Sequence, residues 1–431
     1  MRTAVIVLGD LGRSPRMQYH AASLAAAGHD VDLVGLEGAE VMPLLAANPR
    51  VHCHRLPDHS FKGRAKGGTK RFVFGSLARA VGQARRLWVT LRRAPKADVI
   101  LVQNPPAVPA LAVAWLVARL RGSRLIIDWH NLSHTVAAIR LGERHRAVKA
   151  VARSERRWAR RADEHLAVSK ALAAWLSSNY GITASVVYDR PPATFTRPAP
   201  SAAVAMWTKL AQAASLGAER LPLVVCPTSW TPDEDFDLLL EALERAERQL
   251  TRRRGGSSAF APGASADKLD PPAPADPPVP LLAVILTGKG ALRESFEARL
   301  ARRSFSLIAV RTQWLAPEDY PVLIGMADLG LCLHQSSSGL DLPMKVADFR
   351  GAGVPVAAFD YAPVLGEVLT PGHEGVTFRD PGDLAAVLVQ VASRSADAAS
   401  TLSRSRAWLF ENPAVRWEEE WPATALPVLR G

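Results

Sequence analysis

Short runs of β-forming residues alternate with longer helical stretches along most of this sequence, and that alternation leaves few folds open to the chain. In the first half we expect strands at Ala4–Leu8, Val31–Leu36, Val99–Val102, Leu125–Asp128, His165–Val168 and Ser185–Tyr188. Helices are expected at Met17–Ala27, Phe72–Arg93, Ala107–Arg121, His145–Ala162 and Lys170–Asn179. Strands that alternate with helices in this way predict a parallel sheet with helices on both faces.

The alternation restarts after a proline-rich stretch, DRPPATFTRPAP. Strands are expected there at Leu221–Cys226, Leu281–Thr287, Leu307–Val310, Leu329–Leu333 and Val354–Ala357. The helices expected between them are Asp235–Arg252, Ala291–Arg302, Tyr320–Ala327 and Met344–Gly351. We therefore predict an α/β protein of two doubly wound, Rossmann-like domains that face each other across a cleft, with ligands at the carboxyl ends of the strands.

These patterns also predict the domain limits. Residues 1–190 form the first domain, 191–200 the linker and 201–431 the second domain, and the last helix packs back on the first domain. A length of 431 residues agrees with this division, because domains average roughly 150 residues. Residues 253–280 combine many prolines with few apolar residues, so we expect a disordered insertion there.

The charge is distributed unevenly along the chain. Residues 1–190 contain 30 basic and 13 acidic residues, whereas the remainder contains 23 and 28. This excess predicts an anionic partner for the first half. The longest apolar run, Ala107–Ala118, is shorter than the ~20 residues of a membrane-spanning helix, and the first strand does not resemble a secretory signal. We therefore expect a soluble or peripheral protein.

The cysteines give a further expectation about the compartment. Cys53, Cys226 and Cys332 lie far apart in apolar or strand-like runs, without the spacing of a zinc site or a disulfide framework. We interpret all three as reduced core residues of a cytosolic-type protein.

Two polar motifs follow strands of the first domain. Gly9, Asp10, Gly12 and Arg13 lie in a turn that opens a helix, where backbone can approach a ligand; the alternative is an ordinary turn capped by Ser14. DWHNLSH ends the strand at Asp128 and brings His130, Asn131 and His134 into one turn. Because polar residues at the carboxyl end of a buried parallel strand usually face the cleft, we favour a role in the site.

Two more motifs follow strands of the second domain. In PTSWTPDED, Asp233 and Asp235 fit the first turn of a helix better than a metal site, and Ser229 and Trp230 are the better ligand candidates. In TGKG, Lys289 precedes a helix among small residues, which suits a phosphate but does not match the spacing of an ATPase phosphate loop.

The most informative segment is HQSSSGLDLPMKVADFRGAGVPV. Ser338, Gly339 and Leu340 precede a helix in which Lys345 and Asp348 stand three residues apart and share a face. A lysine for a diphosphate and a carboxylate for ribose hydroxyls suit a nucleotide sugar. The alternative is an exposed ion pair worth a few tenths of a kcal/mol, which does not explain the adjoining serines or the Gly-x-Pro turn.

P-x-K-x-x-[D/E] before a G-x-P-V strand resembles the donor site of GT-B glycosyltransferases. More narrowly, the stretches VLGDLGRSPRMQYHAASLA, GHDVDLVG, QNPP, DWHNL, PTSWTPDEDF, LTGKG and SSSGLDLPMKVADFRGAGVPV resemble one family. It is the chitobiosyl-diphosphodolichol β-1,4-mannosyltransferase family of asparagine-linked glycan assembly. The resemblance runs from about Thr3 to Phe378 and omits the insertion. Family members typically carry an N-terminal membrane anchor, which this sequence does not show.

The resemblance implies inverting transfer of mannose from GDP-mannose to a lipid-diphosphate-linked GlcNAc-type acceptor, without a metal or other cofactor. Inversion needs a general base, for which His130 and then Asp10 are the candidates. The donor would contact Ser229, Lys289, Ser338, Gly339, Leu340, Lys345 and Asp348, with the lysines neutralising the leaving diphosphate. The acceptor would contact Gly9, Gly12, Arg13, Asn131 and His134.

The basic stretches HSFKGRAKGGTKR and RRLWVTLRRAPK suit anionic lipid headgroups. They predict peripheral attachment at the cytosolic face of a membrane, the endoplasmic reticulum in a eukaryote or the plasma membrane in a bacterium. Three alternatives remain: another nucleotide sugar or acceptor, a non-catalytic scaffold of a membrane glycosylation complex, and a nucleic-acid binder. An intact donor motif argues against the scaffold, and the missing reading motif argues against nucleic acid as a partner.

Overall fold

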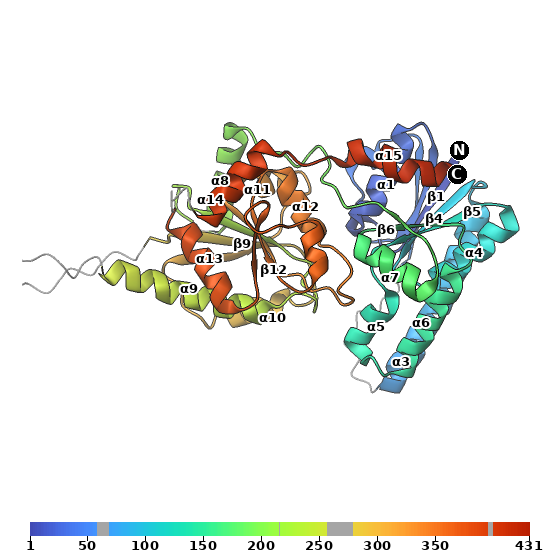
Figure 1. Ribbon diagram of the computed structural model, residues 1–431, viewed down its shortest axis with the longest axis horizontal. Helices are drawn as coiled ribbons and strands as arrows, with labels where there is room; N and C mark the ends of the chain where they lie inside the picture. Colours follow the sequence, from blue (N-terminus) through green and yellow to red (C-terminus); the bar gives the residue numbers. More distant parts are fainter. Residues whose placement is uncertain (58–68, 215, 257–278, 395–399) are drawn as a thin grey trace, which may run out of the picture. The chain divides into compact units, whose positions relative to one another are not determined.

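The computed structural model describes residues 1–57, 69–214, 216–256, 279–394 and 400–431, with backbone alone for 69–78 and 255–256. The chain forms two compact units, shown in Figure 1. Unit 1 comprises Met1–Asp189, Ser337–Leu342 and Trp417–Gly431; unit 2 comprises Arg190–Ser336 and Pro343–Arg416.

Unit 1 is built on a parallel sheet of seven strands. These are β1 (Arg2–Asp10), β2 (Asp30–Leu36), β3 (Val51–Leu56), β4 (Val99–Asn104), β5 (Arg124–Trp129), β6 (Glu164–Ala167) and β7 (Ser185–Val186), in the order β3-β2-β1-β4-β5-β6-β7. The helices are η1 (Leu11–Arg13), α1 (Pro15–Ala26), α2 (Pro43–Ala46), α3 (Thr69–Arg93), α4 (Ala110–Arg121), α5 (Ser133–Leu141), α6 (Arg146–Ala159), α7 (Lys170–Tyr180) and α15 (Trp417–Arg430). The strand order reverses between β1 and β4, the position at which such sheets bind ligands.

Unit 2 is built on a parallel sheet of six strands. These are β8 (Leu223–Pro227), β9 (Leu282–Thr287), β10 (Ile308–Gln313), β11 (Leu329–Cys332), β12 (Val356–Phe359) and β13 (Gly375–Phe378), in the order β10-β9-β8-β11-β12-β13. The helices are α8 (Pro200–Ala214), α9 (Phe236–Gly256), α10 (Arg293–Leu300), α11 (Asp319–Met326), α12 (Met344–Gly351), η2 (Pro363–Glu367), α13 (Pro381–Ala392) and α14 (Thr401–Glu411). Its order reverses between β8 and β11. The predicted fold class, two parallel α/β sheets, is confirmed.

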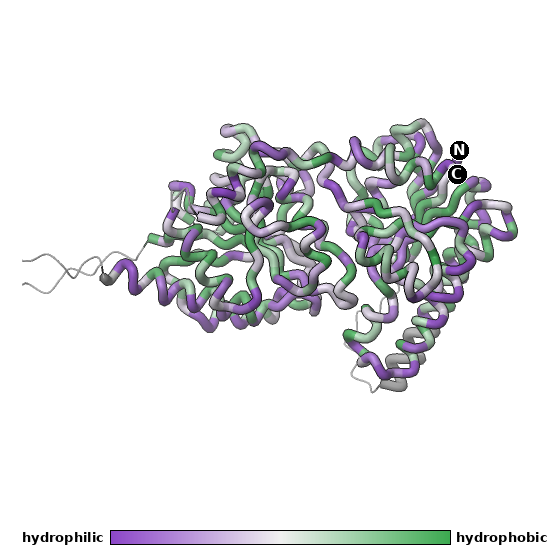
Figure 2. The backbone as a smooth tube through the Cα atoms, in the orientation of Figure 1, coloured by the Kyte–Doolittle hydropathy of each residue, from purple (hydrophilic) through white to green (hydrophobic). Residues whose placement is uncertain are grey.

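The central strands of each sheet are buried on both faces, which explains why they are apolar throughout rather than alternating. In β1, Ile6 faces a core that includes residues of α4 and α7, whereas Val5 and Val7 face the core shared with α1 and α15. Unit 2 has the same arrangement, with α9 and α13 over one face and α8, α11 and α12 over the other. Figure 2 shows hydrophobic residues along the strands inside each unit.

Two strands and one cysteine differ from what the sequence predicts. β3 was missed because it is an edge strand with a polar composition, VHCHRL, and β13 because it has only four residues. Cys53 lies on β3 and is exposed, so its assignment to the core was wrong, whereas Cys226 and Cys332 are buried. The insertion was predicted to begin too early, because α9 continues through Arg253 to Gly256. The rest of that segment, 257–278, lies outside the described residues.

Most of the long apolar run Ala107–Ala118 lies in α4, which packs Leu111, Ala114 and Val117 into the core of unit 1. No helix among the described residues is both long enough and apolar enough to cross a membrane.

Candidate functional site

The turn after β1 is held together by Asp10. Its carboxylate caps η1 by accepting a hydrogen bond from Gly12 N (3.1 Å), and it also accepts one from Ala39 N (3.0 Å). A Cβ at Gly12 would stand 2.3 Å from the carbonyl oxygen of Glu40, so backbone packing alone requires this glycine. The alternative, an ordinary turn capped by the Ser14 side chain, is wrong in that detail, because the Ser14 hydroxyl donates to the Asp10 carbonyl oxygen and makes no capping hydrogen bond to α1. Arg13 is exposed beside this turn.

Asp128, near the end of β5, is the centre of a fully buried charge network. The Arg16 guanidinium on α1 donates to both carboxylate oxygens, Nε to Oδ2 at 2.8 Å and Nη2 to Oδ1 at 2.9 Å. Its third nitrogen donates to Asp189 Oδ1 (2.8 Å) and to the Val187 carbonyl oxygen (3.0 Å). This is the strong bidentate geometry of an arginine-carboxylate pair.

Burial and charge act in opposite directions on the pKa values of this pair. Burial would raise the pKa of Asp128, but the charge of Arg16 and a hydrogen bond from His130 hold it well below its usual range. Burial would likewise lower the pKa of Arg16, but Asp128 and Asp189 raise it. Both groups are therefore ionised, and Asp128 can only accept hydrogen bonds.

The ionised Asp128 carboxylate determines which ring nitrogen of His130 carries the hydrogen. His130 is the first candidate for the general base. His130 Nε2 lies 2.8 Å from Asp128 Oδ2, and the imidazole is 22% exposed. Because the carboxylate only accepts, Nε2 must carry the hydrogen, and Nδ1 carries the lone pair of the neutral ring. A histidine held in this way can accept a proton at Nδ1 while the carboxylate stabilises the resulting cation.

A second buried carboxylate, Glu155 on α6, holds the rest of the DWHNLSH turn. It accepts hydrogen bonds from Asn104 Nδ2, Ser133 N and Tyr180 Oη, and its Oε2 lies 2.8 Å from His134 Nδ1. His134, predicted to bind the acceptor, is therefore engaged with a protein partner. Sequence reasoning missed Glu155, because it lies in an Arg-rich helix where a carboxylate is expected to face solvent.

Asn131 contacts the segment Ser337–Leu342, which belongs to unit 1. Its amide donates to Asp341 Oδ1 (2.8 Å) and to Ser337 Oγ (3.2 Å). In the same segment, the Leu340 carbonyl oxygen accepts a hydrogen bond from Ser169 Oγ at 2.6 Å. The predicted donor residues Ser338, Gly339 and Leu340 thus lie in unit 1, whereas Ser229, Lys289, Lys345 and Asp348 lie in unit 2.

In unit 2 the key carboxylate is Glu234, in the loop after β8. Its Oε2 accepts hydrogen bonds from Ser229 N (3.0 Å), Trp230 N (3.1 Å) and the Thr228 hydroxyl, and its Oε1 pairs with Lys345 Nζ. Burial would lower the pKa of Lys345, but Glu234 raises it, so the ammonium stays charged. Lys345 is on the first turn of α12 and its side chain is 19% exposed. The structure thus joins Ser229 and Lys345 through a residue that the sequence analysis did not single out.

The loops after β8 and β9 are packed backbone to backbone. A Cβ at Gly288 would stand 1.7 Å from the Thr228 carbonyl oxygen, and one at Gly290 would stand 2.0 Å from that of Ser229. Trp230 adopts a positive φ of 53°, which is unusual for a large side chain and typical of functional loops. Between the two glycines, Lys289 is exposed, with its ammonium 3.9 Å from the centre of the Trp314 ring.

The remaining candidates of unit 2 have separate partners. Asp348 accepts a hydrogen bond from Tyr320 Oη at 3.2 Å. Asp233 Oδ2 lies 3.3 Å from His334 Nδ1; burial would raise its pKa, but hydrogen bonds from His334 and Thr231 lower it to about 2. Asp235, expected in the first turn of a helix, lies just before α9 and accepts hydrogen bonds from its first backbone amides. Among the described residues, no group of three or more His, Cys, Asp or Glu could hold a metal ion.

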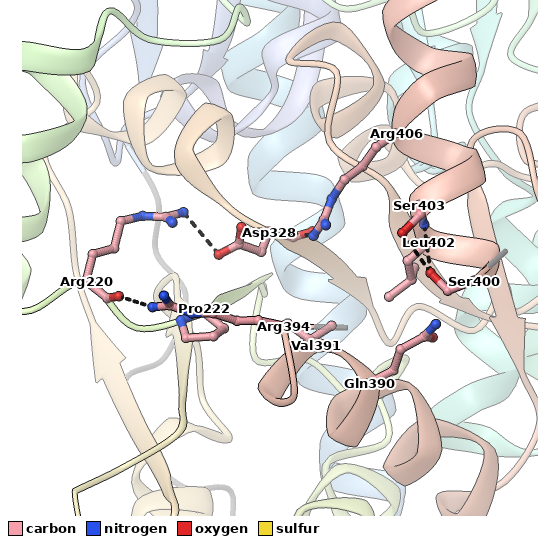
Figure 3. Close-up of a pocket in the computed structure, with 10 residues that line it drawn as sticks. All are labelled: Arg220, Pro222, Asp328, Gln390, Val391, Arg394, Ser400, Leu402, Ser403 and Arg406. Carbon is pink, nitrogen blue, oxygen red and sulfur yellow. Dashed lines mark hydrogen bonds and ion pairs between the residues drawn. The ribbon is translucent and has the colours of Figure 1, made fainter. Parts of the chain in front are cut away.

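A cavity of about 320 Å³ lies elsewhere in unit 2 (Figure 3). Its lining includes Arg220 and Pro222, just before β8, and Asp328, just before β11. It therefore lies toward the amino ends of these strands, whereas the predicted residues lie at the carboxyl ends. None of the predicted site residues lines it.

Comparison with solved structures identifies the fold. HepE of Anabaena, in complex with UDP-glucose, superposes with a TM-score of 0.64 over 99% of each chain, at 15% identity. WaaG, a glycosyltransferase involved in lipopolysaccharide biosynthesis, gives a TM-score of 0.61 over 100% of both chains, at 14% identity. At such identities the likeness shows the fold alone, which is GT-B.

Comparison of sequences identifies the family. Residues 12–192 match the glycosyl transferase 4-like domain. The mouse chitobiosyldiphosphodolichol beta-mannosyltransferase is 36% identical over 99% of this chain and 88% of that protein, and the human one is 37% identical over 98% and 91%. The UDP-glycosyltransferase TURAN of Arabidopsis thaliana is 36% identical over 99% and 97%. With similarity of this extent to several of its members, the chain belongs to the chitobiosyldiphosphodolichol beta-mannosyltransferase family.

Proposed function

We propose that this protein is an inverting mannosyltransferase that moves mannose from GDP-mannose to a chitobiosyl unit on a lipid diphosphate, with a β-1,4 linkage. The observation that carries the proposal is the similarity to the mammalian enzymes over almost the whole chain. Charged groups at the carboxyl ends of both sheets support it, because such folds bind ligands there.

Donor binding is assigned to unit 2. Lys345 offers the diphosphate a cation whose charge is maintained by Glu234, and Lys289 offers a second, exposed cation. Asp348 is suited to accept hydrogen bonds from the ribose hydroxyls. As the bond from mannose to the diphosphate breaks, negative charge grows on the leaving oxygens, and fixed cations stabilise that charge.

Acceptor activation is assigned to unit 1. His130 Nδ1 takes the proton from the attacking sugar hydroxyl, and Asp128 stabilises the imidazolium that forms. Asp10 is the weaker candidate, because backbone amides already occupy its carboxylate. We propose further that no metal takes part, so that the lysines alone neutralise the diphosphate.

The experiment is a donor and acceptor panel with the purified chain. A synthetic chitobiosyl-diphospholipid is incubated with GDP-mannose, UDP-glucose or UDP-GlcNAc, with and without EDTA, and the product linkage is determined. We expect a β-linked mannosyl product from GDP-mannose alone, formed equally well in EDTA. No product from GDP-mannose would reject the proposal, and loss of activity in EDTA that Mg²⁺ or Mn²⁺ restores would reject metal independence.

The similarity to TURAN favours one alternative, a UDP-sugar as the donor. The same panel decides between the two, because transfer from UDP-glucose or UDP-GlcNAc in place of GDP-mannose would establish the alternative. The scaffold hypothesis predicts no transfer from any donor.

A lipid-linked acceptor also supports peripheral attachment to a membrane. Of the residues predicted to make it, the basic Lys62, Arg64 and Lys66 lie outside the described residues, whereas the aromatic Trp88 and the basic Arg92 lie together near the end of α3. We propose that the protein binds vesicles with anionic lipids and is released as salt rises, because salt screens such contacts over roughly 8 Å at physiological strength. Sedimentation with anionic and neutral vesicles tests this, and equal binding to both would contradict it.

A further inference from the structure

We propose that the carboxy-terminal helix α15 positions the catalytic base: Trp421 fixes the proton of His20, and His20 acts through Asp128 to hold His130 in its orientation. The proposal rests on the function above, in which His130 is the base. His20 and Trp421 are positioning residues, since neither is assigned any contact with substrate.

The first step is the contact between α15 and α1. Figure 1 shows α15 (red) beside α1 (blue), two helices of unit 1 that lie at opposite ends of the sequence. Trp421 Nε1 donates a hydrogen bond to His20 Nδ1 at 2.9 Å, and both side chains are buried. An indole nitrogen can only donate, so His20 Nδ1 must be the accepting, unprotonated nitrogen.

The tautomer of His20 determines which of its nitrogens carries a hydrogen toward Asp128. A neutral His20 whose Nδ1 accepts must carry its hydrogen on Nε2, and Nε2 lies 3.3 Å from Asp128 Oδ2, close enough to attract the carboxylate although the contact lacks the alignment of a hydrogen bond. This contact is longer than the others to the same oxygen, which Arg16 Nε and His130 Nε2 reach at 2.8 Å. With the hydrogen on Nδ1 instead, Nε2 would present a lone pair to the carboxylate and repel the oxygen that orients His130.

His20 stays neutral, as this argument requires. Burial lowers its pKa first, and the charge of Arg16 lowers it further, against the opposite effect of Asp128. Asp189 is the other charged group of the network, paired with Arg16. From α15, the groups packed against His20 are the rings of Trp417 and Trp421, which bring no charge. The position of the hydrogen on His20 is therefore decided by the indole of Trp421.

A small displacement of Asp128 matters for catalysis because a base must be aligned with the hydroxyl that it deprotonates. Misplacement by about 1 Å can cost about a hundredfold in rate. Loss of the Trp421 contact should therefore reduce kcat while leaving donor binding, which is assigned to unit 2, unchanged.

The test compares two substitutions on α15. Trp421→Phe removes the donor to His20, whereas the matched control Trp417→Phe removes an indole donor from the same helix, one that bonds Ser23 Oγ on α1 at 2.9 Å. We expect Trp421→Phe to lower kcat about three- to tenfold, the range for one hydrogen bond, with the KM for GDP-mannose unchanged. Trp417→Phe should keep kcat within about twofold.

Nitrogen NMR of histidine-labelled protein supplies a readout that is independent of activity. The wild type should show His20 with its hydrogen on Nε2 alone, and Trp421→Phe should show exchange with the other tautomer. An unchanged His20 tautomer in Trp421→Phe, or equal kcat values for the two variants, would overturn the proposal. If His130→Ala is fully active, the base assignment fails as well, and the NMR result separates that failure from a wrong tautomer.

A second pair of variants avoids any change in α15. His20→Gln keeps one acceptor and one donor, whereas His20→Met fills the space without either. We expect His20→Gln to retain at least half of the wild-type kcat and His20→Met to lose about as much as Trp421→Phe. Equal activity of the two would overturn the proposal.

Discussion

Asp128 in unit 1 and Glu234 in unit 2 are both buried carboxylates paired with a cation, yet the two pairs differ in what the cation can reach. The Arg16 side chain is 1% exposed, and its guanidinium pairs with both Asp128 and Asp189. Its positive charge is therefore neutralised inside the protein. Lys345 is 19% exposed, and its ammonium has one carboxylate partner, Glu234. The first pair is suited to orient a neutral histidine, and the second to present a positive charge to a ligand. A buried ion pair can therefore serve either purpose, depending on whether the cation reaches solvent.

The largest effect should come from the histidine that Asp128 orients. His130→Ala should lower kcat about 10²- to 10⁴-fold, the usual contribution of a general base. The free energy of unfolding should change by less than about 1 kcal/mol, because the ring is partly exposed and Asp128 keeps both hydrogen bonds from Arg16. Steady-state kinetics and urea unfolding check both parts. A kcat within tenfold of the wild type would show that His130 is not the general base, and that the Asp128–Arg16 pair does not orient one.

The next effect is on stability. Asp128→Asn should reduce the free energy of unfolding by about 3–5 kcal/mol, because it leaves the buried Arg16 without its main counter-charge. Asp237→Asn is the matched control, since Asp237 pairs with Arg299 but is 79% exposed. The control should change stability by no more than about 0.5 kcal/mol. Equal losses in urea unfolding would show that burial does not distinguish the two pairs.

Lys345→Ala should separate binding from stability. It should reduce the free energy of unfolding by about 2–3 kcal/mol, less than Asp128→Asn, because Glu234 keeps its hydrogen bonds from Thr228, Ser229 and Trp230. Adding Glu234→Gln should restore most of that stability but not the affinity for GDP-mannose. Calorimetric titration and urea unfolding of the single and double variants measure both. Recovery of donor binding in the double variant would show that Lys345 has only a structural role.

The smallest effect is a difference in pH dependence. The pKa of Lys345 is raised in the folded protein, so its stabilising contribution is complete below the unfolded value near 10.4 and is lost as pH rises through the folded pKa. The pKa of Asp128 is lowered, so its contribution is lost only as pH falls below about 3.9. The Lys345→Ala/Glu234→Gln variant should therefore lose less stability than the wild type between pH 9 and pH 11. Identical losses of stability in the variant and the wild type would contradict a raised pKa for Lys345 in the folded protein.

Most of the fold could be predicted because buried parallel strands are short apolar runs that any reading of the sequence detects. The strands that were missed are β3, whose edge position permits polar residues, and β13, whose four residues give no clear pattern. The boundary of α9 was placed too early because its last turns are Arg- and Gly-rich, although the helix continues through them.

The site was less predictable because its buried carboxylates are identified only by their partners. Glu234 follows two prolines and an aspartate and reads as a helix-capping acid, yet it accepts hydrogen bonds from the loop and pairs with a lysine 111 residues away. Arg16 and His20 had a detectable signal: they stand four residues apart on α1, so they share a face of that helix, and both are buried. The assignments of individual residues to donor and acceptor stay predictions until the variants above are measured.

Because α15 belongs to unit 1, the first unit of the protein is completed only when the end of the chain has been synthesised. During synthesis, residues 1–189 leave the ribosome long before α15 is made. Until then, the apolar residues of α1 and of the sheet have no contact with Trp417, Trp421, Ala425 and Leu429. Unit 2 draws its whole sheet and all its helices from residues 190–416 and can fold while these residues of unit 1 are still uncovered. We therefore expect a chain that stops before Trp417 to leave the apolar residues of unit 1 that pack on α15 exposed to water.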